Sequence, residues 1–204
     1  MTGNRFRFFE RGRGGRPVAL AAAAVFFLCT GVVMGTTDPP ADVTVRENKG
    51  IYTVEARFLV DQPPAAVRTV LTDYAEIPRF MPDVRSSVVL ERTIGRAVVE
   101  QEAVSGVMMF SKRVHLVLEI DEQADTLVFK DRCGRSFKKY EGAWRLAEHY
   151  GQTAVLYELT AEPAFDVPGL VLKRLLRRDS GQMIERLRRE IATRSVSTPS
   201  ADRR

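Results

Sequence analysis

The sequence has 204 residues, 45% of them hydrophobic and 28% charged, and a formal net charge of +5 at pH 7. This length suffices for one domain of ordinary size once the two ends are set aside. Residues 1–35 hold five Arg and one Glu, and residues 168–204 hold ten Lys and Arg against four Asp and Glu, so the stretch between them carries −5 and argues against a nucleic-acid-binding domain.

Cysteine and histidine are scarce. Cys29 falls in an N-terminal apolar run, which leaves Cys133 as the one thiol in the rest of the chain, beside two histidines. One thiol forms no intramolecular disulfide, and no His, Cys and Asp residues occur at metal-ligand spacing. The sequence also lacks a Gly-rich phosphate loop and a G-x-S-x-G motif. We therefore expect no metal, no cofactor and no catalytic set of a common type.

Residues 1–35 have the pattern of a targeting segment. Five arginines precede an apolar run from Val18 to Met34, and Val33 and Gly35 are small enough for a cleavage site. The pattern fits a signal peptide or, alternatively, an uncleaved inner-membrane anchor formed by residues 18–35. Either places the rest of the chain outside the cytoplasm, in the periplasm or otherwise exported, because the arginines stay inside.

A short Pro-rich linker, residues 36–42, leads into the first expected element. Residues 43–60 alternate between apolar and polar side chains, as a strand does, with a turn or bulge at 48–50. A helix is predicted from Pro63 to about Asp73, because proline is tolerated in a first helical turn. A second, broken helix is expected to begin near Tyr74.

Two prolines then bracket a pair of large apolar residues. Phe80 and Met81 stand between Pro78 and Pro82, and each proline disfavours helix in the residue before it. We expect an open, non-helical loop from which Phe80 and Met81 project into the domain. The alternative is a buried loop that merely closes the core.

From Val84 onward, about six strands are expected in consecutive antiparallel hairpins, with turns at Ile94–Gly95, 121–125 and 150–152. The next stretch, from Pro168 to Ser195, predicts one long amphipathic helix, with a bend at Gly181. Its apolar stripe consists of Leu172, Leu176, Met183, Leu187 and Ile191. Its basic residues are Lys173, Arg174, Arg177, Arg178, Arg186, Arg188 and Arg189.

These elements predict an α+β domain over residues 43–195, followed by a disordered tail at 196–204. A curved antiparallel sheet of about six to seven strands, with two short helices after the first strand, buries one face under the long C-terminal helix. A curved sheet wrapped around a single helix leaves space between them. The two short helices and the loop before the long helix are expected to form the rim of that space.

The arrangement resembles the START-like (SRPBCC) superfamily, the helix-grip fold of lipid-transfer proteins, plant pathogenesis-related proteins and aromatic polyketide cyclases. Its coenzyme-Q-binding and cyclase/dehydrase branch is the nearest likeness. The resemblance covers about Val54 to Ile191 and rests on "VLTDYAEIPRFMPDV", "FSKRV", "YEGAWRL" and "PAFDVPGLVLKRLLRR" in this order. It implies a hydrophobic ligand held between sheet and helix, and no shared catalytic set.

Residues on the inward faces of these motifs are candidates for lining or gating the cavity. The segment with Phe80 and Met81 and the segment 165–170 are predicted to face each other across its mouth. Glu100, Arg145 and Tyr140 are candidate polar contacts, although alternation places Arg145 outward. The candidate ligand-binding residues are Phe80, Met81, Met108, Phe110, Tyr140, Trp144, Tyr157, Phe165 and Leu172.

Three of these positions admit two interpretations. Gly142, between inward aromatic residues, either leaves a hollow or admits the long helix. Trp144 belongs either to the core or to a ligand wall, and Met108 suits either a variable partner or plain core packing. Strand alternation points His115 outward, so we expect it to be exposed and non-catalytic.

Three classes of function remain open. The favoured one is an exported binding or carrier module for a hydrophobic small molecule, a lipid or an isoprenoid quinone. The second is a cyclase or dehydratase on an aromatic precursor, which needs an acid or base inside the cavity. The third is an envelope protein whose basic helix binds an anionic membrane surface, although a solvated helix face explains the same charges.

Overall fold

The computed structural model describes the backbone of residues 41–107 and 110–197, and the side chains of that range except 105–111 and 197. The expected N-terminal targeting segment, most of the expected linker and most of the expected tail lie outside the described residues. The elements that follow all belong to one compact unit, Thr37–Arg204.

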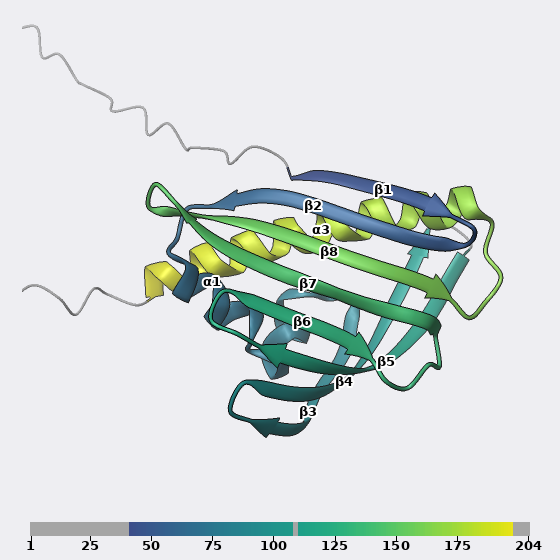
Figure 1. Ribbon diagram of the computed structural model, residues 1–204, viewed down its shortest axis with the longest axis horizontal. Helices are drawn as coiled ribbons and strands as arrows, with labels where there is room; N and C mark the ends of the chain where they lie inside the picture. Colours follow the sequence, from purple (N-terminus) through teal and green to yellow (C-terminus); the bar gives the residue numbers. More distant parts are fainter. Residues whose placement is uncertain (1–40, 108–109, 198–204) are drawn as a thin grey trace, which may run out of the picture. The chain divides into compact units, whose positions relative to one another are not determined.

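Eight strands form a single antiparallel sheet in the order β1-β2-β8-β7-β6-β5-β4-β3 (Figure 1). Consecutive strands are neighbours except where β2 pairs with β8, which brings the first and last hairpins together. The strands are β1 (Asp42–Asn48), β2 (Ile51–Val60), β3 (Val84–Thr93), β4 (Arg96–Val107), β5 (Phe110–Glu122), β6 (Thr126–Asp131), β7 (Phe137–His149) and β8 (Gln152–Pro163).

The sheet has eight strands rather than six or seven because residues 43–60 form two strands instead of one. Lys49 and Gly50 have φ values of 51° and 80° between β1 and β2, and Tyr150 and Gly151 have 49° and 81° between β7 and β8. Positive φ at both central residues produces the tight hairpin turn whose twist matches that of the flanking strands. The other two expected turns also lie between consecutive strands, at Gly95 and before Thr126.

Between β2 and β3 the chain forms α1 (Pro64–Leu71), a 3₁₀ turn η1 (Tyr74–Glu76) and α2 (Ile77–Phe80). The expectation of an open loop at Phe80 is therefore wrong. Pro78 occupies the first turn of α2, where a missing N–H breaks no hydrogen bond. The helix ends at Phe80, and its C-cap residue Met81 immediately precedes Pro82, so only the second proline acts as the sequence suggested.

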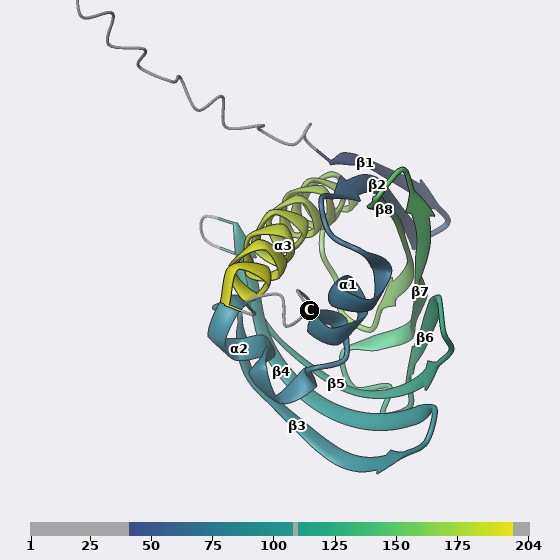
Figure 2. The same cartoon turned by 90° about the vertical axis from the view of Figure 1, so that its left-hand side faces the viewer.

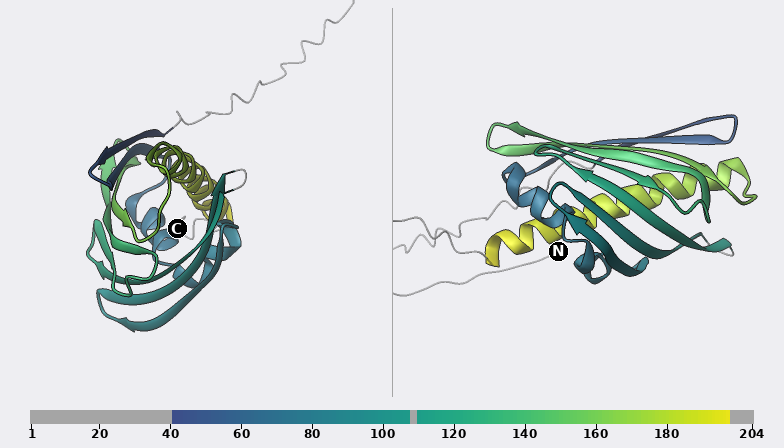
Figure 3. Two further views of the ribbon diagram at one scale, coloured as in Figure 1. Left: turned by 90° about the vertical axis from the view of Figure 1, so that its right-hand side faces the viewer. Right: turned by 60° about the horizontal axis from the view of Figure 1, so that its bottom comes forward.

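The long helix α3 (Gly169–Ser197) lies along the concave face of the sheet, which curves around it (Figure 2). It continues through Gly181, and α1 covers one end of the curved sheet (Figure 2, Figure 3). The most buried large side chains of the domain include Ile184, Leu187 and Ile191 of α3. They pack with the inward residues of β2 and β8 in one core, which confirms the helix-grip fold and the apolar stripe.

None of the helices within the described residues is long and apolar enough to cross a bilayer.

Candidate ligand-binding cavity

A cavity of about 330 Å³ lies between the inner face of the sheet and α3. Strand alternation builds its wall, because β5 directs Val114, Leu116, Leu118 and Ile120 inward, as their spacing predicts. The helical segment before β3 closes one side. The other apolar residues that line the cavity are Val70, Leu71, Ile77, Phe80, Met81, Val84, Ala103, Val104, Leu127, Phe129, Phe137, Trp144, Leu159, Leu176, Met183 and Leu187.

Aromatic rings form one connected group on the sheet side of the cavity. The ring of Phe129 lies 6.0 Å from that of Tyr140 and 6.4 Å from that of Tyr157, centroid to centroid. Trp144 packs on Tyr157 at 4.3 Å, and Phe137 packs on Tyr140 at 4.9 Å. Rings held on several sides have little rotational freedom, so this wall is a preformed surface.

Three tyrosines line the cavity, and each has a raised pKa. Burial raises the pKa of Tyr140 to about 12, although interaction with the Tyr157 hydroxyl lowers it in part. Burial and the neighbouring Tyr140 raise the pKa of Tyr157 well above 10. Burial and the carboxylate of Glu122 raise the pKa of Tyr74. All three phenols therefore stay protonated and neutral at physiological pH.

The charged lining residues lie on the helix side of the cavity. Asp83 follows α2, whereas Asp179 and Arg186 belong to α3, and Arg186 forms an ion pair with Asp83. The side chain of Asp83 is 59% exposed, so the cavity opens to solvent at this place. Gln101 of β4 also lines the cavity and donates to the Ser87 hydroxyl at 3.2 Å.

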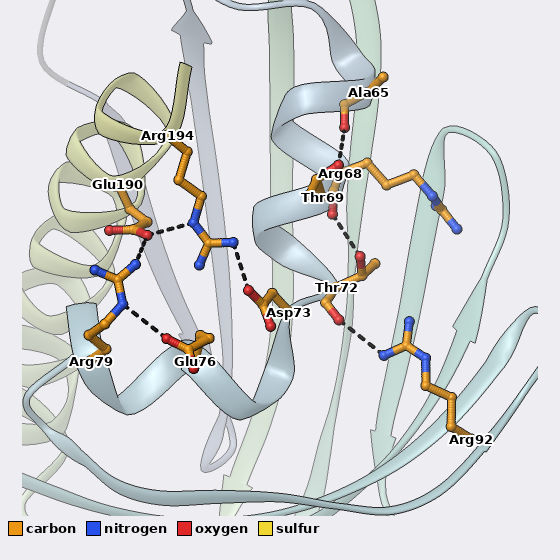
Figure 4. A network of polar contacts seen from close by, with 10 residues as sticks. All are labelled: Ala65, Arg68, Thr69, Thr72, Asp73, Glu76, Arg79, Arg92, Glu190 and Arg194. Atoms are coloured by element: carbon orange, nitrogen blue, oxygen red, sulfur yellow. Dashed lines mark hydrogen bonds and ion pairs between the residues drawn. The ribbon is translucent and has the colours of Figure 1, made fainter. Parts of the chain in front are cut away.

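An ion-pair cluster joins the short helices to the C-terminal half of α3 (Figure 4). Glu190, only 6% exposed, accepts hydrogen bonds from Arg79 of α2 and from Nε of Arg194 at 2.6 Å. Arg194 also donates to Asp73 at 2.6 Å, and Arg79 donates to Glu76 at 3.0 Å. The cluster holds α2, which carries Phe80, against the cavity.

Of the candidate ligand-binding residues, the structure brings five together around the cavity: Phe80, Met81, Tyr140, Trp144 and Tyr157. Leu172 is buried in α3 but is not part of the lining. Phe165 packs edge-on against Phe137 at 6.0 Å and lies under the Lys112 ammonium, also outside the lining. The side chains of Met108 and Phe110 lie outside the described residues.

The predicted gate is wrong. The segment at Phe165 leads into α3 at Gly169, whereas Arg79 of α2 contacts Glu190. A separation of 21 helical residues amounts to about 30 Å along the axis. The two segments therefore lie at opposite ends of α3 and cannot face each other across one opening.

Of the three candidate polar contacts, only Tyr140 lines the cavity. Arg145 points outward and pairs with Glu158, as alternation predicted. Glu100 lies on the outer face, where its Oε1 is 2.9 Å from Nε2 of His115. His115 does face outward, but its side chain is only 16% exposed, because Cys133 of the loop after β6 and Glu100 contact the imidazole ring. The expectation of an exposed histidine is wrong.

Neither interpretation of Gly142 is correct. A Cβ at this position would lie 2.6 Å from the ring of Phe129 and 2.1 Å from the backbone oxygen of Glu158. The space is therefore filled by the aromatic ring of the adjacent strand β6, not by α3 and not by a ligand. Gly142 allows Phe129 to turn into the wall of the cavity.

The basic residues of α3 do not form one solvated face. Arg188 is buried, with its guanidinium 5.2 Å from the ring centre of Phe58 and 3.2 Å from Glu185. Arg186 forms an ion pair with Asp83 at the open side of the cavity. Arg174, Arg177 and Arg178 remain exposed in the N-terminal half of the helix.

Sequence reasoning missed several cavity residues. Phe129 and Phe137 lie on strands whose alternation was recognised, so the period of two could have identified them. Gln101, Asp179 and Ser180 line the cavity as well. They had no such signal, because polar residues on a helix flank or a mixed strand resemble surface positions.

The chain matches a family model described as "Polyketide cyclase / dehydrase and lipid transport" over residues 60–188. No curated protein matches it.

Several solved structures share the fold. TTHA0849 from Thermus thermophilus is 22% identical, with a TM-score of 0.62 over 70% of this chain and 99% of that one. The Zhui aromatase/cyclase from Streptomyces sp. R1128 is 16% identical, with a TM-score of 0.61 over 71% and 96%. A STAR-related lipid transfer protein from Xanthomonas axonopodis is 16% identical, with a TM-score of 0.57 over 76% and 99%. At these identities the likeness concerns the fold.

Proposed function

Because this chain belongs to the polyketide cyclase/dehydrase and lipid transport family, within the START-like superfamily, we propose that it binds and carries one hydrophobic small molecule. The observation that supports this function is the cavity of about 330 Å³, lined mainly by aliphatic and aromatic side chains. Small-molecule sites are typically concave, mostly apolar and about 300–1,000 Å³ in volume.

The cavity chemistry favours carrying over catalysis. A cyclase or dehydratase needs a group that gives or takes a proton near neutral pH. The buried phenols of Tyr140 and Tyr157 have pKa values raised by burial, so they act there as neutral hydrogen-bond donors and not as bases. On the sheet side of the cavity, the wall therefore suits binding better than proton transfer.

We place the carrier outside the cytoplasm, on the basis of the arginine-rich and apolar pattern of residues 1–35. There its cargo is a single-chain lipid or an isoprenoid quinone. An anionic membrane surface, approached through the exposed basic residues of α3, is a second partner that this location suggests.

The test is to produce the protein in the envelope of a bacterial host and to measure its native mass, followed by solvent extraction of the bound material. We expect one apolar molecule per chain. An empty protein that also takes up no added quinone, lipid or apolar dye contradicts the proposal.

Two matched variants locate the ligand. Ala103 lines the cavity, whereas Ala147 of β7 is exposed. Ala103→Phe fills space that the ligand needs, so we expect this variant to carry no bound ligand. Ala147→Phe leaves the cavity unchanged, so we expect it to retain the bound ligand. If both folded variants retain the ligand equally, the ligand does not bind in this cavity.

A further inference from the structure

We propose that the ligand is an uncharged molecule whose buried end carries an oxygen acceptor, a carbonyl, hydroxyl or ether oxygen, bound by the phenol pair Tyr140 and Tyr157. The inference rests on the proposed function and specifies its ligand class.

The phenol pair is built into the rigid part of the cavity. Tyr140 belongs to β7 and Tyr157 to β8, two directly paired strands, and both residues line the cavity. The ring of Phe129 contacts both, and Trp144 packs on Tyr157. The hydroxyl groups are therefore held in place by packing before any ligand enters.

The hydrogen-bonding capacity of the pair is not used up within the protein. The two hydroxyls interact with each other, which occupies one of their two O–H donors. No other hydrogen-bond partner for either hydroxyl occurs among the side chains that the structure describes. Both residues line the cavity, so the second O–H can donate to an acceptor inside it, and this hydrogen bond favours a ligand that carries an acceptor. An oxygen atom of the ligand supplies it.

The placement of charge excludes an ionised group at this position. The charged lining residues, Asp83, Asp179 and Arg186, come from α3 and the segment after α2, whereas the phenol pair belongs to the sheet. A carboxylate bound at the phenols would lose its hydration without a cationic partner beside it, which is strongly unfavourable. The ligand end that reaches Tyr140 and Tyr157 is therefore neutral.

The size of the cavity restricts the rest of the ligand. About 330 Å³ is near the lower limit for drug-sized ligands. It accommodates one compact ring system or one chain.

Three aromatic probes of nearly equal shape test this inference: 2-acetylnaphthalene, 2-isopropylnaphthalene and 2-naphthoate. They carry a neutral acceptor, no acceptor and an anionic group, respectively. Binding is measured on the delipidated full chain by calorimetry and by displacement of an apolar fluorescent dye. We expect the ketone to bind about tenfold more tightly than the hydrocarbon, and the carboxylate to bind most weakly.

Substitutions assign the preference to the phenol pair. Tyr140→Phe and Tyr157→Phe, singly and together, are expected to reduce the ratio of ketone to hydrocarbon affinity to about one while the affinity for the hydrocarbon is retained. Tyr52→Phe is the matched control. Tyr52 is a buried tyrosine that does not line the cavity, so loss of its hydroxyl leaves the ratio unchanged.

The outcomes distinguish the inference from the function on which it rests. If no probe binds, the proposed function fails. If ketone and hydrocarbon bind equally to the wild type, the function stands and the inference is overturned. The inference is also overturned if the folded double variant still prefers the ketone to the hydrocarbon. It is overturned as well if naphthoate binds most tightly of the three probes. Because the first comparison uses the wild-type protein alone, the test does not depend on the folding of any variant.

Discussion

Gly142 illustrates how a single missing side chain shapes the cavity wall. Its backbone lies so close to β6 and β8 that the ring of Phe129 occupies the position of a side chain. That ring in turn contacts both members of the phenol pair. The geometry of the proposed ligand contact therefore depends on a residue that itself contacts no ligand.

Gly142→Ala is expected to destabilise the domain by about 1–3 kcal/mol or more, because overpacking a filled site forces the backbone to move. One of the two close atoms is the backbone oxygen of Glu158, at 2.1 Å from the added Cβ, which cannot rotate away. Urea unfolding monitored by the fluorescence of Trp144 measures the change. The same samples should lose affinity for an apolar dye as Phe129 is displaced.

Gly181 provides the control for this substitution. It lies within α3, and a Cβ there meets no atom within 4 Å. Gly181→Ala is expected to stabilise the protein by up to about 1 kcal/mol, since alanine has the higher helix propensity. Equal effects of the two alanine substitutions contradict the close packing at Gly142.

At the scale of elements, the contact between α2 and α3 is expected to control access to the cavity. α2 is a single turn of four residues, too short to be stable alone. The ion-pair cluster around Glu190 fixes it against α3 (Figure 4). Because Phe80 and Met81 line the cavity at this segment, loss of the cluster is expected to loosen one wall.

Glu190→Gln is expected to lower the free energy of unfolding by about 1–3 kcal/mol, since it leaves Arg79 and Arg194 without their shared carboxylate. The estimate stays low because the Arg79 side chain is 54% exposed and screened by solvent. The dissociation rate of a bound dye, measured by stopped-flow mixing, is expected to increase. Glu148→Gln, at an exposed carboxylate on β7, should change neither quantity appreciably. An unchanged dissociation rate in Glu190→Gln refutes the role of α2 in access.

At the scale of the whole molecule, the buried tyrosines make stability sensitive to alkaline pH. Burial raises the pKa of Tyr74, Tyr140 and Tyr157 in the folded protein, whereas phenols in the unfolded chain titrate near pH 10. Their contribution to stability is thus complete below about pH 10 and is lost as the pH rises further, because only the unfolded state then releases protons.

Between about pH 10 and pH 12 the free energy of unfolding is expected to fall by up to about 1.4 kcal/mol per pH unit for each buried phenol. Urea unfolding across this range measures the slope, and tyrosinate absorbance reports whether a phenol ionises before unfolding. Tyr140→Phe removes one of the buried phenols, so the free energy of unfolding should fall less steeply with pH in this variant. A slope that is the same in this variant contradicts the burial of Tyr140.

Much of this fold follows from local patterns in the amino-acid sequence. Alternation in the strands, the expected turns and the stripe of α3 predicted a curved antiparallel sheet over one long helix, and the resemblance identified this arrangement as the helix-grip fold. Phe80, Met81, Tyr140, Trp144 and Tyr157 were expected in one interior, and they line the cavity. These features follow from local periodicity, which depends only on the geometry of each element.

Only the tertiary structure decided which elements meet. The mutual approach of Tyr140 and Tyr157, the ring of Phe129 against Gly142, the contact of α2 with Glu190 and the partial burial of His115 all join residues that are distant along the chain. Such distances depend on strand register, sheet curvature and crossover path accumulated over many residues, and periodicity carries no information about them. For this reason part of the apolar lining of the cavity could be predicted, but not the location of its opening or the pairing of its polar groups.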